Sequence, residues 1–126
     1  MYSLLMEDSE IKGLSIRQPW ASLIASGKKT LEVRTWPCKY RGRILICASR
    51  SREKLSDDLP RGVTICLATI IACRAMEPGD VQAAGGVTYD AGMYVWELAD
   101  IKPVNAVAIR GTLSFFKIPA DVQSRL

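Results

Sequence analysis

The chain changes from a helical pattern to a strand pattern within one run of eight residues, Gly27-Lys28-Lys29-Thr30-Leu31-Glu32-Val33-Arg34. Leu31 and Val33 alternate with polar neighbours, which is the period of an extended strand. The polar side chains of the run bring ammonium groups, a carboxylate and a guanidinium within reach of each other. Such a set binds polar or anionic ligands and also supports proton chemistry.

The residues before this run predict a strand and then a helix. Apolar and polar residues alternate over 13–17, which indicates a short strand. Apolar residues then recur at helical spacing, with a proline at the first turn, and predict a helix over 19–26. Gly27 suits the left-handed residue that ends such a helix.

The rest of the chain reads as a series of strands. Residues 43–49 form a nearly continuous apolar run, typical of a strand buried on both faces. The other predicted segments are strands at 63–76, 93–99, 105–110 and 113–118, a long connection at 77–92 with a helical turn near 80–84, and a last helical turn in 119–125. The predicted fold class is therefore mainly β with flanking helices, α+β in content, arranged as a small or half-open β-barrel.

Length and composition fit one globular domain. The chain has 126 residues, of which 48% are hydrophobic and 24% charged. We expect a flexible segment at 1–12 and a single domain at 13–126. No apolar run approaches the length that spans a bilayer, and residues 1–10 lack the features of a signal peptide, which predicts an intracellular, cytoplasmic protein without membrane association.

Cysteine and histidine usage limits the chemistry. There are four cysteines, none in a C-x-x-C pair, and no histidine, so we predict neither a metal site nor a cofactor. The lack of histidine excludes Ser-His-Asp and Cys-His catalysis. Cys47, Cys66 and Cys73 stand in apolar runs and are expected to be buried, whereas Cys38 stands in a polar loop and is the candidate for a reactive thiol.

The positive charge is concentrated in one segment. The net charge is +4, and residues 28–54 alone hold nine basic and two acidic residues. This balance favours a surface that faces a polyanion, or else a solvated basic face. Within it, Trp36 and Tyr40 alternate with Lys39 and Arg41, an arrangement that can stack bases while neutralising phosphates. Alternatively, Trp36 covers the core.

Three motifs follow one another along the chain. They are Leu14-Ser15-Ile16-Arg17-Gln18-Pro19-Trp20-Ala21-Ser22, then G-x-K-x-x-E-x-R at Gly27, Lys29, Glu32 and Arg34, then Arg41-Gly42-Arg43 before the apolar strand. Together they resemble the ASCH domain family, whose signature is the second motif. Later residues, from Tyr94 to Leu98 and from Ile109 to Phe116, look like the closing half of the family. The resemblance implies a PUA-like β-barrel associated with RNA, with a cleft lined by the signature residues.

The resemblance also implies a possible activity. One bacterial branch of the family hydrolyses N4-acetylcytidine with the signature lysine, a threonine three residues later and a later glutamate. Lys29 matches this lysine, whereas Glu32 stands where that branch has threonine. As an enzyme, the protein would be an amidohydrolase or a ribonuclease-type hydrolase with Lys29 and Glu32 as catalytic residues.

The chemistry of the signature favours recognition over catalysis. A partly dry cleft lowers the pKa of a lysine and makes it a base or nucleophile. We expect Glu32 to have the opposite effect and keep Lys29 charged, and a charged lysine binds rather than abstracts protons. Glu32 can accept hydrogen bonds from a base edge, and Arg34 can hold a phosphate through two parallel bonds. The alternative is an internal salt-bridge network.

The predicted function is therefore binding of RNA, of another single-stranded nucleic acid, or of a nucleotide-like small molecule. The predicted binding residues are Arg17, Gln18, Lys28, Lys29, Glu32, Arg34, Trp36, Arg41 and Arg43. A protein-interaction module in transcription-related assemblies is a further alternative.

Overall fold

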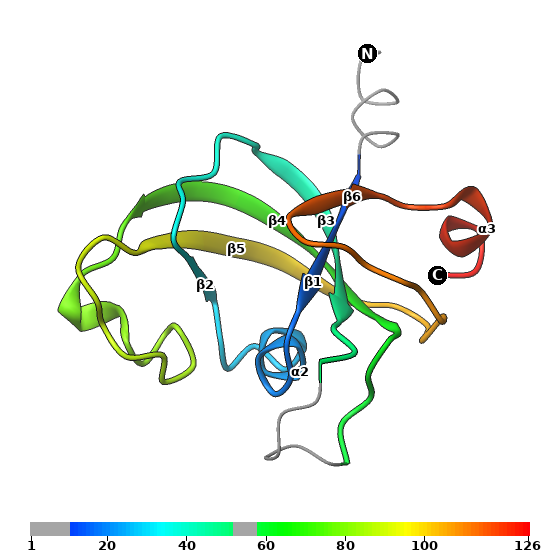
Figure 1. The fold of residues 1–126 in the computed structure, drawn as a ribbon, viewed down its shortest axis with the longest axis horizontal. Coiled ribbons are helices and arrows are strands. Elements are labelled where there is room, and N and C mark those ends of the chain that lie inside the picture. Colours follow the sequence, from blue (N-terminus) through cyan, green and yellow to red (C-terminus); the bar gives the residue numbers. More distant parts are fainter. Residues whose placement is uncertain (1–10, 52–57) are drawn as a thin grey trace.

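Strands make up most of the regular structure in the computed structural model, which describes residues 11–51 and 58–126 (Figure 1). The strands are β1 (Lys12–Ile16), β2 (Leu31–Arg34), β3 (Gly42–Ala48), β4 (Thr64–Ala75), β5 (Tyr94–Pro103) and β6 (Phe115–Lys117). The helices are α2 (Trp20–Ala25) and α3 (Ala120–Gln123), together with a 3₁₀ turn, η1 (Pro78–Asp80). No helix in these described ranges is long and apolar enough to cross a membrane.

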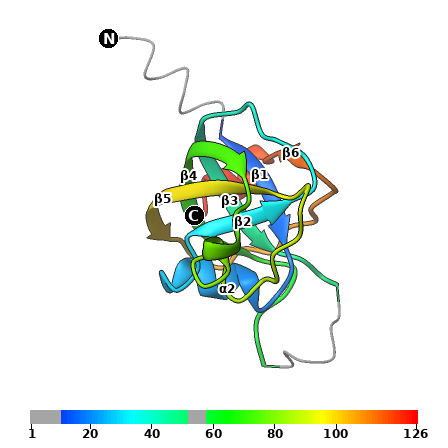
Figure 2. The ribbon, with the colours of Figure 1, turned by 90° about the vertical axis from the view of Figure 1, so that its left-hand side faces the viewer.

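The six strands form one curled sheet in the order β2-β5-β4-β3-β1-β6. All neighbours are antiparallel except β1 and β3, which run parallel. Strands β2 and β6 are the two edges, so the sheet curls without closing completely, and α2 covers one end of it (Figure 2). The predicted fold class, mainly β with flanking helices, is confirmed as a half-open barrel.

Strand β3 is buried on both faces because its side chains enter two separate cores. Ile44 and Ile46 belong to the main core inside the curl, which also holds Ile24 of α2. Leu45 and Cys47 point the other way, into a smaller core closed by the segment around α3. The strand is therefore apolar throughout because it is buried on both faces, as predicted.

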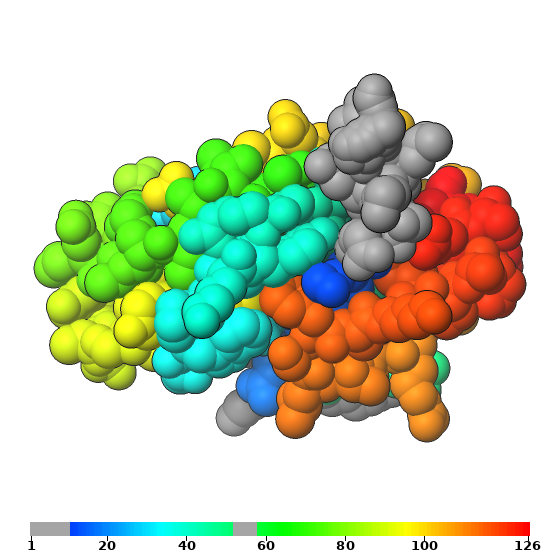
Figure 3. Space-filling model, turned by 90° about the horizontal axis from the view of Figure 1, so that it is seen from above, coloured from blue at the N-terminus to red at the C-terminus, as the bar shows by residue number. Residues whose placement is uncertain are grey.

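An aromatic cluster fills the end of the barrel opposite α2. The Trp36 ring lies edge-on to the Trp96 ring, with centroids 4.7 Å apart, and Phe115 packs against both. Tyr40 contacts Phe115 as well, so the loop between β2 and β3 lies beside the segment that carries β6 (Figure 3). Trp36 thus takes part in core packing.

Several predictions differ from the structure. Residues 105–110 form no strand and contribute only a single bridge, between Val63 and Ala108. Strand β5 continues to Pro103, because the long strand β4 still pairs with it there. The predicted flexible segment 1–12 lies outside the described residues except for its last two, and Lys12 already belongs to β1.

The prediction of Cys38 as the candidate for a reactive thiol is wrong. Its side chain is buried, its backbone N–H donates to the Cys73 Sγ at 3.2 Å, and burial raises the pKa of its thiol. Cys73, expected to be buried, is partly exposed. The polar residues around Cys38 conceal that its own side chain points into the barrel end.

Candidate functional site

A pocket of about 700 Å³ opens where the carboxyl ends of β1 and β3 meet α2, β2 and the 109–114 segment. Its volume lies within the range of about 300–1,000 Å³ that small-molecule sites occupy. The described side chains that line it include five basic residues, Arg17, Lys29, Arg34, Arg50 and Arg110, and one acidic residue, Glu32. The pocket is therefore strongly electropositive.

The inner wall carries a buried group of charges. Lys29 is 1% exposed, and its Nζ donates to the Ala84 carbonyl at 2.6 Å and lies 3.8 Å from Glu32 Oε1. Arg34 Nε donates to Glu32 Oε2 at 2.8 Å. The three signature side chains thus meet as predicted, and their charges are largely satisfied by each other and by the backbone.

Burial lowers the pKa of Lys29. Loss of water around the ammonium group outweighs the attraction of Glu32, and Arg34 lowers the pKa further. The expected effect of Glu32, which raises the pKa of Lys29, is therefore present but smaller than the effect of burial. The lysine is closer to the neutral, nucleophilic form than an exposed lysine would be.

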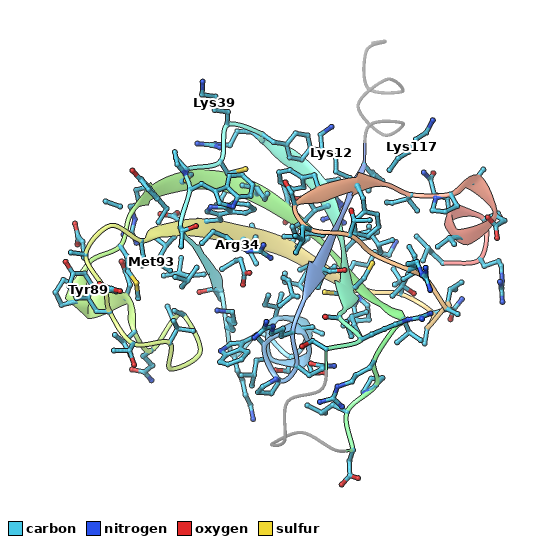
Figure 4. All side chains as sticks on the ribbon, viewed as in Figure 1. Lys12, Arg34, Lys39, Tyr89, Met93 and Lys117 are labelled. Atoms are coloured by element: carbon cyan, nitrogen blue, oxygen red, sulfur yellow. The ribbon has the colours of Figure 1, made fainter. Side chains whose placement is uncertain are left out.

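Arg34 bridges the open side of the sheet. It reaches from β2 toward β1 (Figure 4), and its Nη2 donates to the Ser15 carbonyl at 3.2 Å. Its guanidinium also lies over the Trp96 ring, 5.6 Å from the centroid. Nε holds Glu32 within β2 and one Nη2 bond holds β1, so the predicted two-bond grip on a phosphate would fall to the remaining N–H groups of the guanidinium.

The connection 77–92 forms part of the site. The Ala83 carbonyl accepts hydrogen bonds from the Thr30 and Leu31 N–H groups, and Ala84 accepts the bond from Lys29. Gly85 has a φ of +78°, and a Cβ at this position would lie 3.1 Å from the Lys29 Cδ. The sharp backbone turn at Gly85 therefore presses directly against the lysine stem.

Comparison with protein-family models gives a match to the ASCH domain over residues 14–110. The chain belongs to the ASCH domain family. Activating signal cointegrator 1 from Homo sapiens is 46% identical over 39 residues, which is 31% of this chain and 7% of that protein. The Mus musculus protein of the same name is 49% identical over the same shares of each chain. This ASCH chain thus matches only a small part of either relative.

Solved structures of similar fold include the ASCH protein from Zymomonas mobilis. It has 17% sequence identity and a TM-score of 0.64, with 94% of each chain covered. A single-residue variant of that protein has 18% identity and a TM-score of 0.63, covering 91% of this chain and 94% of the other. At this identity the likeness shows the fold.

Of the remaining predicted site residues, only Arg17 lines the pocket of this ASCH domain. Lys28 is exposed outside the lining. Gln18 is completely buried, where its amide holds Ser22 of α2 and donates to the Pro60 carbonyl at 2.9 Å. The glutamine of the Gln-Pro-Trp motif therefore joins the helix start to a distant loop.

Three predicted residues lie away from the pocket. Trp36 packs in the aromatic cluster, and Arg41 donates to the carbonyl of Cys38 beside it at 2.6 Å. Arg43 donates to Thr69 Oγ1 and to the Asp100 carbonyl. The described part of the basic segment, residues 28–51, is thus divided between the α2 end and the end where Lys39 lies (Figure 4), and residues 52–54 lie outside the described residues.

Sequence reasoning missed several lining residues of the ASCH pocket. Arg50 belongs to the basic segment 28–54 and Arg110 to the later stretch of the resemblance, but neither was predicted as a binding residue. Trp20 of the Gln-Pro-Trp motif also lines the pocket, and its buried Nε1–H has no acceptor among residues 11–51 and 58–126.

Proposed function

We propose that this ASCH domain binds a nucleic acid or a nucleotide-like ligand in the electropositive pocket. The observation that carries the proposal is the composition of the described lining, in which five basic side chains and one carboxylate share a cavity of about 700 Å³. Glu32 still has free lone pairs, since a carboxylate accepts about four hydrogen bonds. It can therefore read an amino or imino N–H of a base while the cations hold phosphate.

Single-stranded RNA oligonucleotides provide the test. We expect their affinity, measured by fluorescence anisotropy, to fall with salt with a slope of about 0.7 per phosphate contacted. A variant with Arg50→Gln and Arg110→Gln should bind weakly, and a variant with Lys39→Gln and Lys117→Gln should bind like the natural chain. Both lose two positive charges, but Lys39 and Lys117 lie at the barrel end opposite α2 (Figure 4). Equal losses in both variants would point to nonspecific charge and contradict the proposal.

A hydrolase is the second candidate, because Lys29 is buried beside Glu32 with a lowered pKa. In this reading the lysine acts as a base or nucleophile on an N-acylated nucleoside such as N4-acetylcytidine. The test is liquid chromatography of N4-acetylcytidine after incubation with the protein. Turnover should drop at least about 100-fold in Lys29→Met, shown by its unfolding curve to be folded, and persist in Lys39→Met. Without turnover by the natural chain, binding remains the proposed function.

The protein-interaction alternative and the intracellular location stay predictions. The exposed large apolar residues among the described ranges are Ile71, Tyr89 and Leu113, and they come from three different segments. No observation on these residues favours a protein partner over a ligand in the pocket.

A further inference from the structure

Three arginines outside the buried signature group come together at the mouth of the pocket. Arg17 follows the carboxyl end of β1, and Arg50 follows that of β3. These two strands are parallel neighbours, with Ile16 opposite Ala48, so their carboxyl ends lie at the same edge of the sheet. The Ser49 N–H donates to the Ile16 carbonyl at 2.9 Å and holds the two exits together.

Arg110 reaches the same edge from the far end of the chain. The Ile109 N–H donates to the Gly62 carbonyl at 3.0 Å, and the Gly62 N–H donates to the Ala48 carbonyl at 2.8 Å. The next residue, Gly111, is packed so closely on β1 that a Cβ there would overlap the Ser15 Oγ. Arg110 is therefore held beside the exit of β3 by backbone contacts.

Two of these arginines are unengaged in the described structure. Arg50 and Arg110 are exposed, and neither forms an ion pair or a hydrogen bond with residues 11–51 or 58–126. In contrast, Arg34, Arg43 and Arg74 all hold protein acceptors. Hydroxyl groups of Ser49, Ser51 and Thr112 line the pocket close to them in sequence. Unpaired guanidinium groups beside hydroxyl donors at a concave mouth suit an oxyanion.

We propose that Arg50 and Arg110, together with Arg17, form a subsite for a terminal phosphate. The ligand would then be a nucleotide phosphomonoester, either a free mononucleotide or the phosphorylated end of a strand, rather than a neutral nucleoside. A phosphomonoester carries close to two negative charges at neutral pH, which suits cations gathered at one point. Internal phosphodiesters each carry one charge and would suit cations spread along a track. This inference rests on the proposed function, because it specifies the ligand of the same pocket.

Isothermal titration with matched probes tests the subsite. The probes are the four ribonucleosides, their 5′- and 3′-monophosphates, and inorganic phosphate as a competitor. We expect at least one monophosphate to bind 10-fold or more tightly than its parent nucleoside, and inorganic phosphate to compete with it. This advantage should fall below threefold in the Arg50→Gln and Arg110→Gln double variant. It should persist in the Lys39→Gln and Lys117→Gln variant, which has the same net charge.

The possible results distinguish a failure of the phosphate subsite from a failure of ligand binding in the pocket. If a nucleoside and its monophosphates bind equally, the phosphate subsite is wrong and the base-binding pocket stands. If none of the probes and no oligonucleotide binds, both proposals fall. An advantage that survives in the arginine variant, or is lost in the lysine variant, also overturns the subsite.

Short oligonucleotides distinguish the two sources of the phosphate. Tetranucleotides with and without a 5′- or 3′-terminal phosphate are titrated beside the mononucleotides. Tighter binding of the phosphorylated strand than of the mononucleotide supports a strand end as the ligand, and the reverse order supports a free nucleotide. Equal binding of phosphorylated and unphosphorylated strands, with no preference among mononucleotides, contradicts the subsite.

Discussion

The inside and the mouth of the pocket use charge in opposite ways. Inside, Lys29, Glu32 and Arg34 are buried or half-buried, and each one holds another or a backbone carbonyl. At the mouth, Arg50 and Arg110 are exposed and have no partner in the described ranges. The difference teaches that the main role of the signature residues is structural: their contacts with each other and with the backbone form the inner wall of the pocket. The side chains most available to a ligand, Arg50 and Arg110, lie outside that signature.

The two regions also differ in what a substitution should do. Removing one member of a buried ion group leaves an uncompensated charge, which costs stability. Removing an exposed cation without a partner leaves nothing unsatisfied. Stability and ligand affinity should therefore separate between the two regions, and the following changes test that separation.

Glu32→Gln should cause the largest loss of stability. The amide keeps the shape of the side chain but removes the charge that faces both Lys29 and Arg34. We expect a loss of about 3 kcal/mol in the free energy of unfolding, measured with urea.

The matched control for this change is Glu97→Gln. Glu97 pairs with Arg74 at 3.0 Å, but both side chains are at least one third exposed. An exposed pair contributes about 0–1 kcal/mol, so the control should lose much less. Equal losses for the two variants would show that the inner group is no more than a surface salt bridge.

Gly85→Ala should come next in size. Alanine is strained at a φ of +78°, and its methyl group would press on the Lys29 stem. Gly86→Ala is the control, since its φ is +90° but nothing lies within 4 Å of an added Cβ. We expect each variant to lose about 1–2 kcal/mol from backbone strain, and Gly85→Ala to lose about 1 kcal/mol more from the contact. Equal unfolding curves for both variants would mean that the loop does not fix the lysine.

Local patterns were sufficient to predict the frame of the inner region. The apolar run of 43–49 predicted β3, and helical spacing predicted α2. Lys29 stands just before β2, and Glu32 and Arg34 stand on it, so these side chains are brought together by residues close to each other in the sequence. Expectations about these elements depend on neighbours in sequence, and the structure agrees with them.

Non-local contacts account for what the sequence did not reveal. The segment of Ala84 and Gly85 packs against Lys29 from far along the chain, so the burial that lowers the pKa of Lys29 could not be read from the signature. Arg50 and Arg110 meet through the parallel pairing of β1 with β3 and the return of 109–111. The composition and residue spacing of a single segment do not show which strands pair or which later segment packs beside them.

Stability should depend on pH through Lys29. Its pKa is lowered in the folded chain, so at alkaline pH the unfolded chain binds the proton that the folded chain has released. The natural chain should therefore gain stability relative to Lys29→Met as pH rises toward the ordinary lysine value of 10.5, and the gain disappears at lower pH.

Urea unfolding of both proteins from pH 7 to pH 10 measures this difference. The relative gain cannot exceed about 1.4 kcal/mol per pH unit for one proton. Other titrating groups are common to both chains and cancel. A relative stability that falls with rising pH would show that Glu32, rather than burial, governs this lysine.

The smallest effect on stability should come from the mouth of the pocket. Arg50→Gln and Arg110→Gln together should change the free energy of unfolding by no more than about 0.5 kcal/mol, because exposed side chains without partners contribute little. Reduced repulsion among the nearby cations would, if anything, stabilise the variant at low salt. The same variant is expected to lose most of its affinity for phosphate-bearing ligands, so it separates binding from folding in a single protein. A loss of several kcal/mol would place these arginines with the buried group and remove the distinction between the inside of the pocket and its mouth.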